Sequence, residues 1–310
     1  MTFHKASSFG NDFIVVAEGE LASAMPRRPL GGLASAVPRR PLGDGGLARD
    51  ICDRQRGVGA DGVVYFTATR AGARFRIFNR DGGAAELSGN GMAALAAVLL
   101  RGRAGGTALT LRSGVGPRRV ALLERRGAEF RLDVEIGQPD FSCRAFLPFL
   151  RRGRQSYRAA GVDFHPVSVG NPHAVVVCRR LPAADRLPAL GAGLERHSLF
   201  PRRTNVEFVQ ATGSGGCRVF FYERGVGPTQ ASSTGSSAVF AVLRRLGLAG
   251  DSLEIESAAG DGPIRLFWRN GIHVQTVTRL ICKGEYFPGS AYGVRQTAQG
   301  RKRQKAKGKR

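Results

Sequence analysis

The feature that most constrains this chain is a segment that occurs twice, 144 residues apart. Residues 74–101 and residues 218–245 share one layout, in which an aromatic strand pattern leads through a polar turn and a small-residue loop to an apolar helix pattern. Serine holds the same place in both copies, as Ser88 and Ser232. A Phe-His pair that leads to Gly-Asn and a run of apolar residues also occurs twice, from residue 3 and from residue 164. The chain therefore predicts two copies of one fold, with a site at their interface.

Helices are predicted at 90–101 and 234–246, and both are apolar on nearly all faces. A helix that is apolar all round is buried, so we expect one central helix wrapped by strands in each half. A further helix is expected near 46–56. Strands are expected at 13–17, 62–67, 73–79, 107–112, 118–123, 129–136, 164–169, 173–178, 205–210, 217–223, 252–257, 263–268 and 272–277.

The same pattern predicts the domain organisation. We expect an N-terminal domain over 1–136, a C-terminal domain over 137–276, a strand over 277–290 that returns to the first domain, and a disordered basic tail over 291–310. A loop over 19–45 interrupts the first domain. It contains the segment 21–31, which recurs at 33–43 with one difference, and its four Pro and four Arg residues exclude a regular core element.

The composition narrows the functional classes. The net charge of +23 invites a nucleic-acid partner, but eight Lys and Arg residues lie in residues 295–310, where we expect only non-specific contact with nucleic acid. Five scattered cysteines without a C-x-x-C spacing predict reduced thiols, a cytoplasmic location and no metal site. No run of 18 apolar residues and no signal-peptide pattern occurs, so we expect no membrane association.

Two loops of small residues open the two predicted buried helices, and their backbone N–H groups are the first candidate site. Two helix N-termini that face one cleft would hold a carboxylate, because each offers unpaired N–H groups and a positive dipole end. The alternative is that these loops are ordinary helix caps. The residues of the loops are Ser88, Gly89, Asn90 and Gly91 in the first copy, and Ser232, Ser233, Thr234 and Gly235 in the second.

Several polar residues at strand ends or turns are further candidates, although asparagine is common in turns for local reasons. These residues are Asn11, Asn79, Asn171, Asn205, Glu223 and Arg224. His173 is a candidate base with an ordering role as the alternative, and Asp61 is a candidate with a turn as the alternative. The glycines around residue 58 do not form a dinucleotide fingerprint, because no strand precedes them and the third glycine is misplaced.

Seven segments, in this order along the chain, resemble the diaminopimelate epimerase family. They are 9–16 (FGNDFIVV), 56–62 (RGVGADG), 75–82 (FRIFNRDG), 88–91 (SGNG), 169–173 (VGNPH), 204–208 (TNVEF) and 222–227 (YERGVG). The resemblance covers residues 3 to about 288. It implies a cofactor-independent epimerase of the α/β class, with two pseudo-symmetric domains, each a curved, mostly antiparallel sheet around a central helix. The active site would lie between the domains.

The resemblance also implies the substrate and the roles of the site residues. The family interconverts L,L- and meso-diaminopimelate, a precursor of lysine and peptidoglycan. The Asn residues above, Glu223 and Arg224, together with Gly89, Asn90, Ser233 and Thr234 of the loops, would bind the substrate. Arg224 would pair with the distal carboxylate. The expected partners are thus an amino acid such as diaminopimelate and a second copy of the chain in a homodimer.

The chain departs from the family where the chemistry takes place. The family has a cysteine acid/base pair, one ahead of each central helix, and this chain has Ser88 and Ser232 there. Pro228 replaces a family glutamate, and Met92 and Ala93 replace a small residue and an arginine. A cysteine pKa can be lowered at a helix N-terminus, whereas a serine hydroxyl starts far higher. Three hypotheses stay open: an epimerase with weakened or altered chemistry, an amino-acid binder without turnover, and a nucleic-acid-associated protein acting through its tail.

Overall fold

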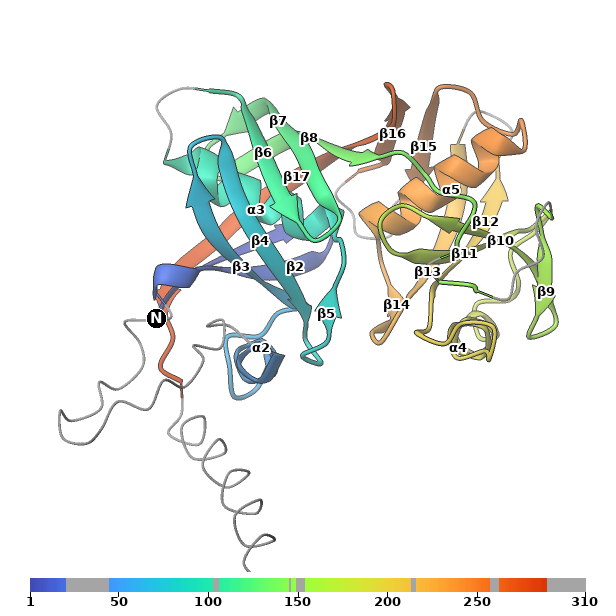
Figure 1. The fold of residues 1–310 in the computed structure, drawn as a ribbon, viewed down its shortest axis with the longest axis horizontal. Coiled ribbons are helices and arrows are strands. Elements are labelled where there is room, and N and C mark those ends of the chain that lie inside the picture. The colour runs from blue at the N-terminus through green and yellow to red at the C-terminus, as the bar shows by residue number, and fades with distance from the viewer. Residues whose placement is uncertain are drawn as a thin grey trace, which may run out of the picture.

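The computed structural model describes residues 1–20, 45–102, 106–144, 146–148, 154–212, 216–256 and 262–288. The repeated segments 21–31 and 33–43 and the tail 291–310 lie outside the described residues, so the predictions made for them stay predictions. Figure 1 shows two lobes side by side, each with one long helix, α3 (Gly89–Arg101) in the first and α5 (Ser233–Arg245) in the second.

The first lobe is a closed ring of strands around α3. Each strand pairs with the next, and the last strand of the chain pairs with both the first strand and the eighth, which closes the ring. In ring order the strands are β1 (Thr2–Ser8), β2 (Asn11–Ala17), β3 (Gly62–Thr69), β4 (Gly72–Asn79), β6 (Ala108–Ser113), β7 (Gly116–Arg126), β8 (Glu129–Gly137) and β17 (Ile272–Glu285). The short β5 (Ala84–Ala85) pairs with β4, and α2 (Gly45–Cys52) packs outside the ring.

The second lobe repeats this arrangement around α5. Its sheet runs through β10 (Val162–Ser168), β11 (Pro172–Val177), β12 (Asn205–Ala211), β13 (Gly216–Glu223), β15 (Ser252–Glu256) and β16 (Ile264–Trp268) to the start of β17. An isolated bridge between Asp140 and Ser168 joins the chain after β8 to the end of β10. The short β9 (Tyr157–Ala159) and β14 (Gly227–Thr229) pair with β10 and β13, and α4 (Leu187–Glu195) packs on β12 and β13.

The lobes are equivalent in topology as well as in sequence. The parallel pairs β2–β3 and β4–β6 of the first lobe recur as β11–β12 and β13–β15 in the second, while most other neighbours are antiparallel. The helices α3 and α5 lie 144 residues apart, which is the offset of the sequence duplication. The predicted α/β fold of two pseudo-symmetric halves is therefore confirmed.

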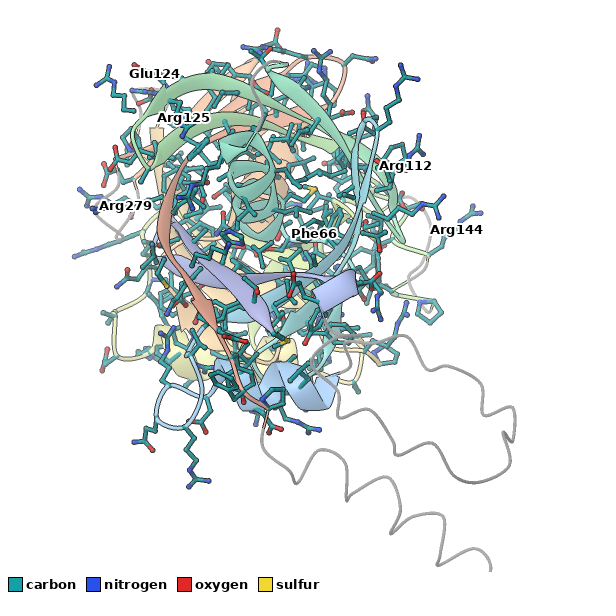
Figure 2. The ribbon with its side chains drawn as sticks, turned by 90° about the vertical axis from the view of Figure 1, so that its left-hand side faces the viewer. Phe66, Arg112, Glu124, Arg125, Arg144 and Arg279 are labelled. Atoms are coloured by element: carbon teal, nitrogen blue, oxygen red, sulfur yellow. The ribbon has the colours of Figure 1, made fainter. Side chains whose placement is uncertain are left out.

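The core of each lobe is the space between the helix and its strands. Ten residues of α3 and eleven of α5 are buried, which matches helices that are apolar all round. Figure 2 looks toward the first lobe and shows α3 inside the curved sheet, with Arg112, Arg125 and Arg279 pointing outward from it. No helix in the described part of the chain is long and apolar enough to cross a membrane.

The structure shortens one predicted helix and adds elements that were not predicted, namely β1, β5, β9, β14 and α4. The helix expected near 46–56 ends at Cys52, because the Asp53 carboxylate accepts the backbone N–H groups of Gln55 and Arg56 and starts a turn. Helix α4 was not predicted. It carries Pro188 in its first turn and two glycines, which lower helix propensity, and Gly191 is needed because a Cβ there would lie 2.6 Å from the Tyr222 ring.

Candidate functional site

A cavity of about 60 Å³ lies where the N-termini of α3 and α5 meet between the lobes. Ser88, Ser232 and all ten residues that the resemblance assigns to substrate binding line it, whereas the candidate base His173 does not. The structure thus brings together side chains from both lobes that are up to 223 positions apart in the sequence. Their roles remain predictions, but their convergence makes this cavity the candidate site. The lining also includes Phe13, Asp61, Ala85, Leu87, Val226 and Thr229.

Ser88 and Ser232 cap the two helices with the same geometry. The backbone angles are φ −144° and ψ 118° at Ser88, and φ −144° and ψ 120° at Ser232. Each hydroxyl oxygen accepts a hydrogen bond of 3.1 Å from the backbone N–H three residues later, at Gly91 or Gly235. Both serines are therefore N-caps, as one of the alternatives predicted, and both also face the cavity. The two readings of these loops are compatible.

The helix N-termini touch across the interface between the lobes. A Cβ added to Gly89 would lie 2.5 Å from the Cβ of Ser233, so only glycine fits at the first of these positions. The Ser233 hydroxyl donates a hydrogen bond to the side-chain oxygen of Asn90 in the other lobe. The Ser233 side chain consequently fills space between the two helix ends, where the backbone N–H groups would otherwise face a ligand.

Two asparagines of the cavity wall, Asn11 and Asn205, are held in place by hydrogen bonds to backbone groups. Asn11 of the first lobe donates to the carbonyl of Ala231 in the second, at 3.2 Å. Asn205 donates to the Pro172 carbonyl at 2.9 Å and accepts the backbone N–H of Arg224 at 3.0 Å. These bonds fix the orientation of the two amide groups. Asn79 lines the cavity at the end of β4.

Glu223 is a buried carboxyl group in the cavity wall. Its Oε1 atom is buried without a hydrogen-bond partner of good geometry, and so is the hydroxyl of Thr229. Burial is the main cause that raises the pKa of Glu223 to about 7; the charge of Glu207 acts in the same direction, while Thr229 and His173 oppose it. The Glu223 carboxyl is thus partly protonated near neutral pH.

His173 lies behind the cavity wall in a chain of hydrogen bonds. Its Nδ1 is 2.7 Å from Oε1 of the buried Glu207, and its Nε2 is 2.8 Å from Oδ1 of Asn171. Asn171 in turn donates to the Thr234 hydroxyl at 3.4 Å, beside the N-terminus of α5. The ring does not line the cavity, and both its nitrogens have partners. The geometry therefore favours the ordering role over the role of a base.

Asp61 combines the turn role expected for it with a place in the cavity wall. Its carboxylate accepts the backbone N–H of Asp12 at 3.1 Å and a hydrogen bond of 3.0 Å from Arg54. Burial raises the pKa of Asp61, and the neighbouring Asp12 adds to the effect. Lys5 and Arg54 both pair with Asp12, so this network ties the start of β2 to the residue that precedes β3.

Neither capping serine has a partner that could activate it as a base. In the described residues, neither hydroxyl is hydrogen-bonded to a histidine or a carboxylate.

None of the five cysteines lines the cavity. Burial raises the pKa of Cys52, Cys143 and Cys217 to about 12. No three described His, Cys, Asp or Glu side chains are placed to hold a metal ion.

Glu86 is a residue of the site that the sequence reasoning missed. It lies two positions before Ser88, and its carboxylate forms an ion pair with the Arg224 guanidinium of the other lobe. Its position in the loop that leads into α3 could have suggested a place near the site. Its ion pair could not be predicted, because Arg224 lies 138 positions away in the sequence. Glu207 was missed as well, because it lies inside a strand pattern and looks like an outward-facing residue.

Comparison with known proteins gives one family. The family model described as "Diaminopimelate epimerase" matches residues 3–141 and 166–279. A diaminopimelate epimerase from Carboxydothermus hydrogenoformans is 31% identical over 299 residues, covering 93% of this chain and 100% of that protein. One from Desulforudis audaxviator is 36% identical over 252 residues, covering 77% of this chain and 82% of that protein.

Solved structures agree on the fold. A hydroxyproline epimerase from Agrobacterium vitis, with bound trans-4-hydroxy-L-proline, matches with a TM-score of 0.63 at 16% identity over 94% of each chain. A predicted epimerase from Pseudomonas aeruginosa matches with a TM-score of 0.59 at 16% identity, covering 93% of this chain and 99% of that chain. At this identity the likeness concerns the fold alone.

Proposed function

Since this chain belongs to the diaminopimelate epimerase family, we propose that its cleft binds diaminopimelate or a similar α-amino acid and exchanges the Cα proton only slowly. The observation that carries the proposal is the pair of serine caps. Ser88 and Ser232 have matching backbone angles, and both face the one cavity, one from each lobe. This arrangement places one side chain on each side of the cavity, as proton transfer at both faces of Cα would require. The two side chains are serine hydroxyls, however, which are very weak acids.

The proposed binding site of the ligand's α-carboxylate lies at the N-termini of the two central helices. The first backbone N–H groups of each helix have no partner within the helix, and the two dipoles add positive potential at the same point. Gly89 and Asn90 supply these groups from α3, and Ser233 and Thr234 supply them from α5. The Ser233 side chain must turn away from Asn90 for a carboxylate to enter between them.

The distal end of the ligand is proposed to bind at Arg224. A planar guanidinium matches a planar carboxylate in a two-bond fork. The backbone of Arg224 is fixed by its hydrogen bond to Asn205, so its side chain projects from a rigid turn. In the described residues Arg224 is the one cationic side chain of the cavity wall. These features support a ligand with a carboxylate at each end.

Epimerisation requires one group that takes the Cα proton from one face and another that returns a proton to the opposite face. A thiol at each helix N-terminus can ionise and perform both steps, because the N-terminus lowers its pKa. A serine hydroxyl without an adjacent base does not ionise at neutral pH. General acid–base groups each contribute about 10²–10⁴ in rate, so two such losses remove most of the activity.

A binder without turnover is the second candidate function. It is favoured by the absence of any activating hydrogen bond to either serine in the described part of the chain. The two candidates share the binding step and differ only in proton exchange at Cα. Binding is consequently the first property to test.

Ligand binding is expected to raise the melting temperature in proportion to the logarithm of the ligand concentration, because the ligand binds the folded state. Arg224→Ala should abolish the rise seen with meso-diaminopimelate, since the distal carboxylate loses its partner. Arg218→Ala is a matched control, because Arg218 lies in β13, the strand that leads to Arg224, and forms an exposed ion pair with Glu256 of β15. A rise that survives Arg224→Ala unchanged would contradict the proposed orientation of the ligand.

A further inference from the structure

The guanidinium of Arg224 already holds a carboxylate in this structure. Its two terminal nitrogens contact the two oxygens of Glu86, with 3.4 Å between Nη1 and Oε1 and a closer contact between Nη2 and Oε2. This is the same two-bond fork that a ligand carboxylate would form with an arginine. Arg224 also donates from Nη1 to the carbonyl of Arg202 at 3.5 Å. No terminal nitrogen of the guanidinium is left without a partner.

The pair lies at the rim of the cleft and joins the two lobes. Glu86 follows β5 in the first lobe, between the lining residues Ala85 and Leu87, while Arg224 follows β13 in the second. The side chains are 31% and 17% exposed, so the pair is partly shielded from solvent. Ion pairs of this kind are stronger than those on an open surface, and a competing ligand must break one.

We propose that the Glu86 carboxylate occupies Arg224 in place of the ligand's distal carboxylate until a ligand displaces it. This competition for Arg224 sets the affinity for ligands with two carboxylates. The inference rests on the proposed function, because it takes Arg224 as the anchor of the distal end. Binding then exchanges one carboxylate for another at a single guanidinium. The gain from the new pair is reduced by the loss of the old one.

The electrostatic surroundings of Glu86 agree with this exchange. Burial alone would raise the pKa of the Glu86 carboxyl, but the hydrogen bond and charge of Arg224 more than offset it, and the pKa is lowered. The group is therefore an anion at neutral pH and competes for Arg224 as an anion. Glu86 is also tethered to the site, so its effective concentration is high and does not fall on dilution.

Glu86→Gln is the test, because it keeps the shape of the side chain and removes its charge. The probes are meso-diaminopimelate, 2-aminopimelate and lysine. Compared with diaminopimelate, 2-aminopimelate lacks the distal amino group and lysine lacks the distal carboxylate. By calorimetry, Glu86→Gln should bind 2-aminopimelate roughly tenfold more tightly than the unmodified protein, the order expected when a shielded ion pair need not be broken. Lysine should gain nothing.

Glu254→Gln is the matched control, because Glu254 pairs with Arg265 on an exposed strand of the second lobe, and it should leave all three affinities unchanged. Glu86→Ala is a second variant with the same expected direction. If Glu86→Gln leaves 2-aminopimelate binding unchanged or weaker, the inference is overturned. If Glu86→Gln weakens the binding of diaminopimelate and of lysine but not that of 2-aminopimelate, Glu86 instead recognises the distal ammonium group. Binding of no probe to any of the proteins would refute the proposed function, and the inference with it.

Discussion

Ser88 and Ser232 cap their helices by hydrogen bonding, but their hydroxyls do not ionise as a thiol at the same position could. Their hydroxyl oxygens accept the backbone N–H groups of Gly91 and Gly235, as a cap requires. A thiol at the same place would cap less strongly but could ionise. The sequence allowed this difference to be predicted, because the identity of the two residues alone determines it. The contact of Ser233 with Asn90 could not be predicted, since it depends on how closely the lobes approach.

Glu223 provides a residue-scale prediction about pH. In the unfolded chain its carboxyl has the ordinary pKa of 4.5, whereas burial raises the folded value to about 7. The folded protein binds the extra proton between these values, so the contribution of Glu223 to stability falls as the pH rises from about 5 to 7. Glu223→Gln removes this loss. The change in the free energy of unfolding caused by Glu223→Gln should therefore be more favourable at pH 8 than at pH 5, by about 1–3 kcal/mol.

The measurement is urea unfolding of both proteins across that pH range. Glu256→Gln is the control, because Glu256 lies in an exposed ion pair and its substitution should have nearly the same effect at both pH values. Equal effects of Glu223→Gln at pH 5 and pH 8 would show that the carboxyl is not held in its neutral form by burial.

At the scale of elements, the two central helices were the most predictable part of the fold. Their predicted limits agree with α3 and α5 to within one residue, because a small-residue cap and a fully apolar run mark them clearly. Helix α4 was hidden by a proline and by glycines that serve packing. The pairing of β8 with β17 was also not predicted, because the paired residues lie 135 to 150 positions apart in the sequence.

Two buried serines, Ser232 at the N-cap of α5 and Ser236 inside the helix, offer a prediction at this scale. Ser232→Ala removes the cap of the Gly235 N–H and should lower the free energy of unfolding by about 1 kcal/mol. Ser236 is buried in the same helix, and its hydroxyl has no hydrogen-bond partner, so Ser236→Ala should leave stability unchanged or raise it. Denaturant titration of the two variants compares them directly. Equal losses would mean that the hydroxyl of Ser232 is not acting as a cap.

At the scale of the whole molecule, the site exists only because the two lobes meet. Each lobe contributes one helix N-terminus, and the contacts of Asn11 with Ala231 and of Glu86 with Arg224 cross between lobes. The duplication predicted that a site would lie at this interface, because two copies of a fold place equivalent residues opposite each other. It could not predict Glu86, whose partner is set by the packing of the lobes. The domain limits placed near Gly137 stay a prediction, although β8 ends there.

The proposed two-sided proton transfer would need a group from each lobe, which determines the design of the final experiment. Restoring a thiol in one lobe supplies a group on one face of Cα only. Restoring both, with Ser88→Cys and Ser232→Cys, should supply both faces. Ser233→Gly belongs in a further variant, because its side chain fills the space between the helix N-termini.

The most direct measurement is the exchange of the Cα proton of diaminopimelate for deuterium in heavy water, followed by NMR for each purified protein. The unmodified chain should exchange at a rate near the background. The double variant, or the triple variant with Ser233→Gly, should exceed either single cysteine variant by at least 10²-fold, the lower contribution of one acid–base group. Rapid exchange by the unmodified chain, or no gain in the double and triple variants, would contradict the account.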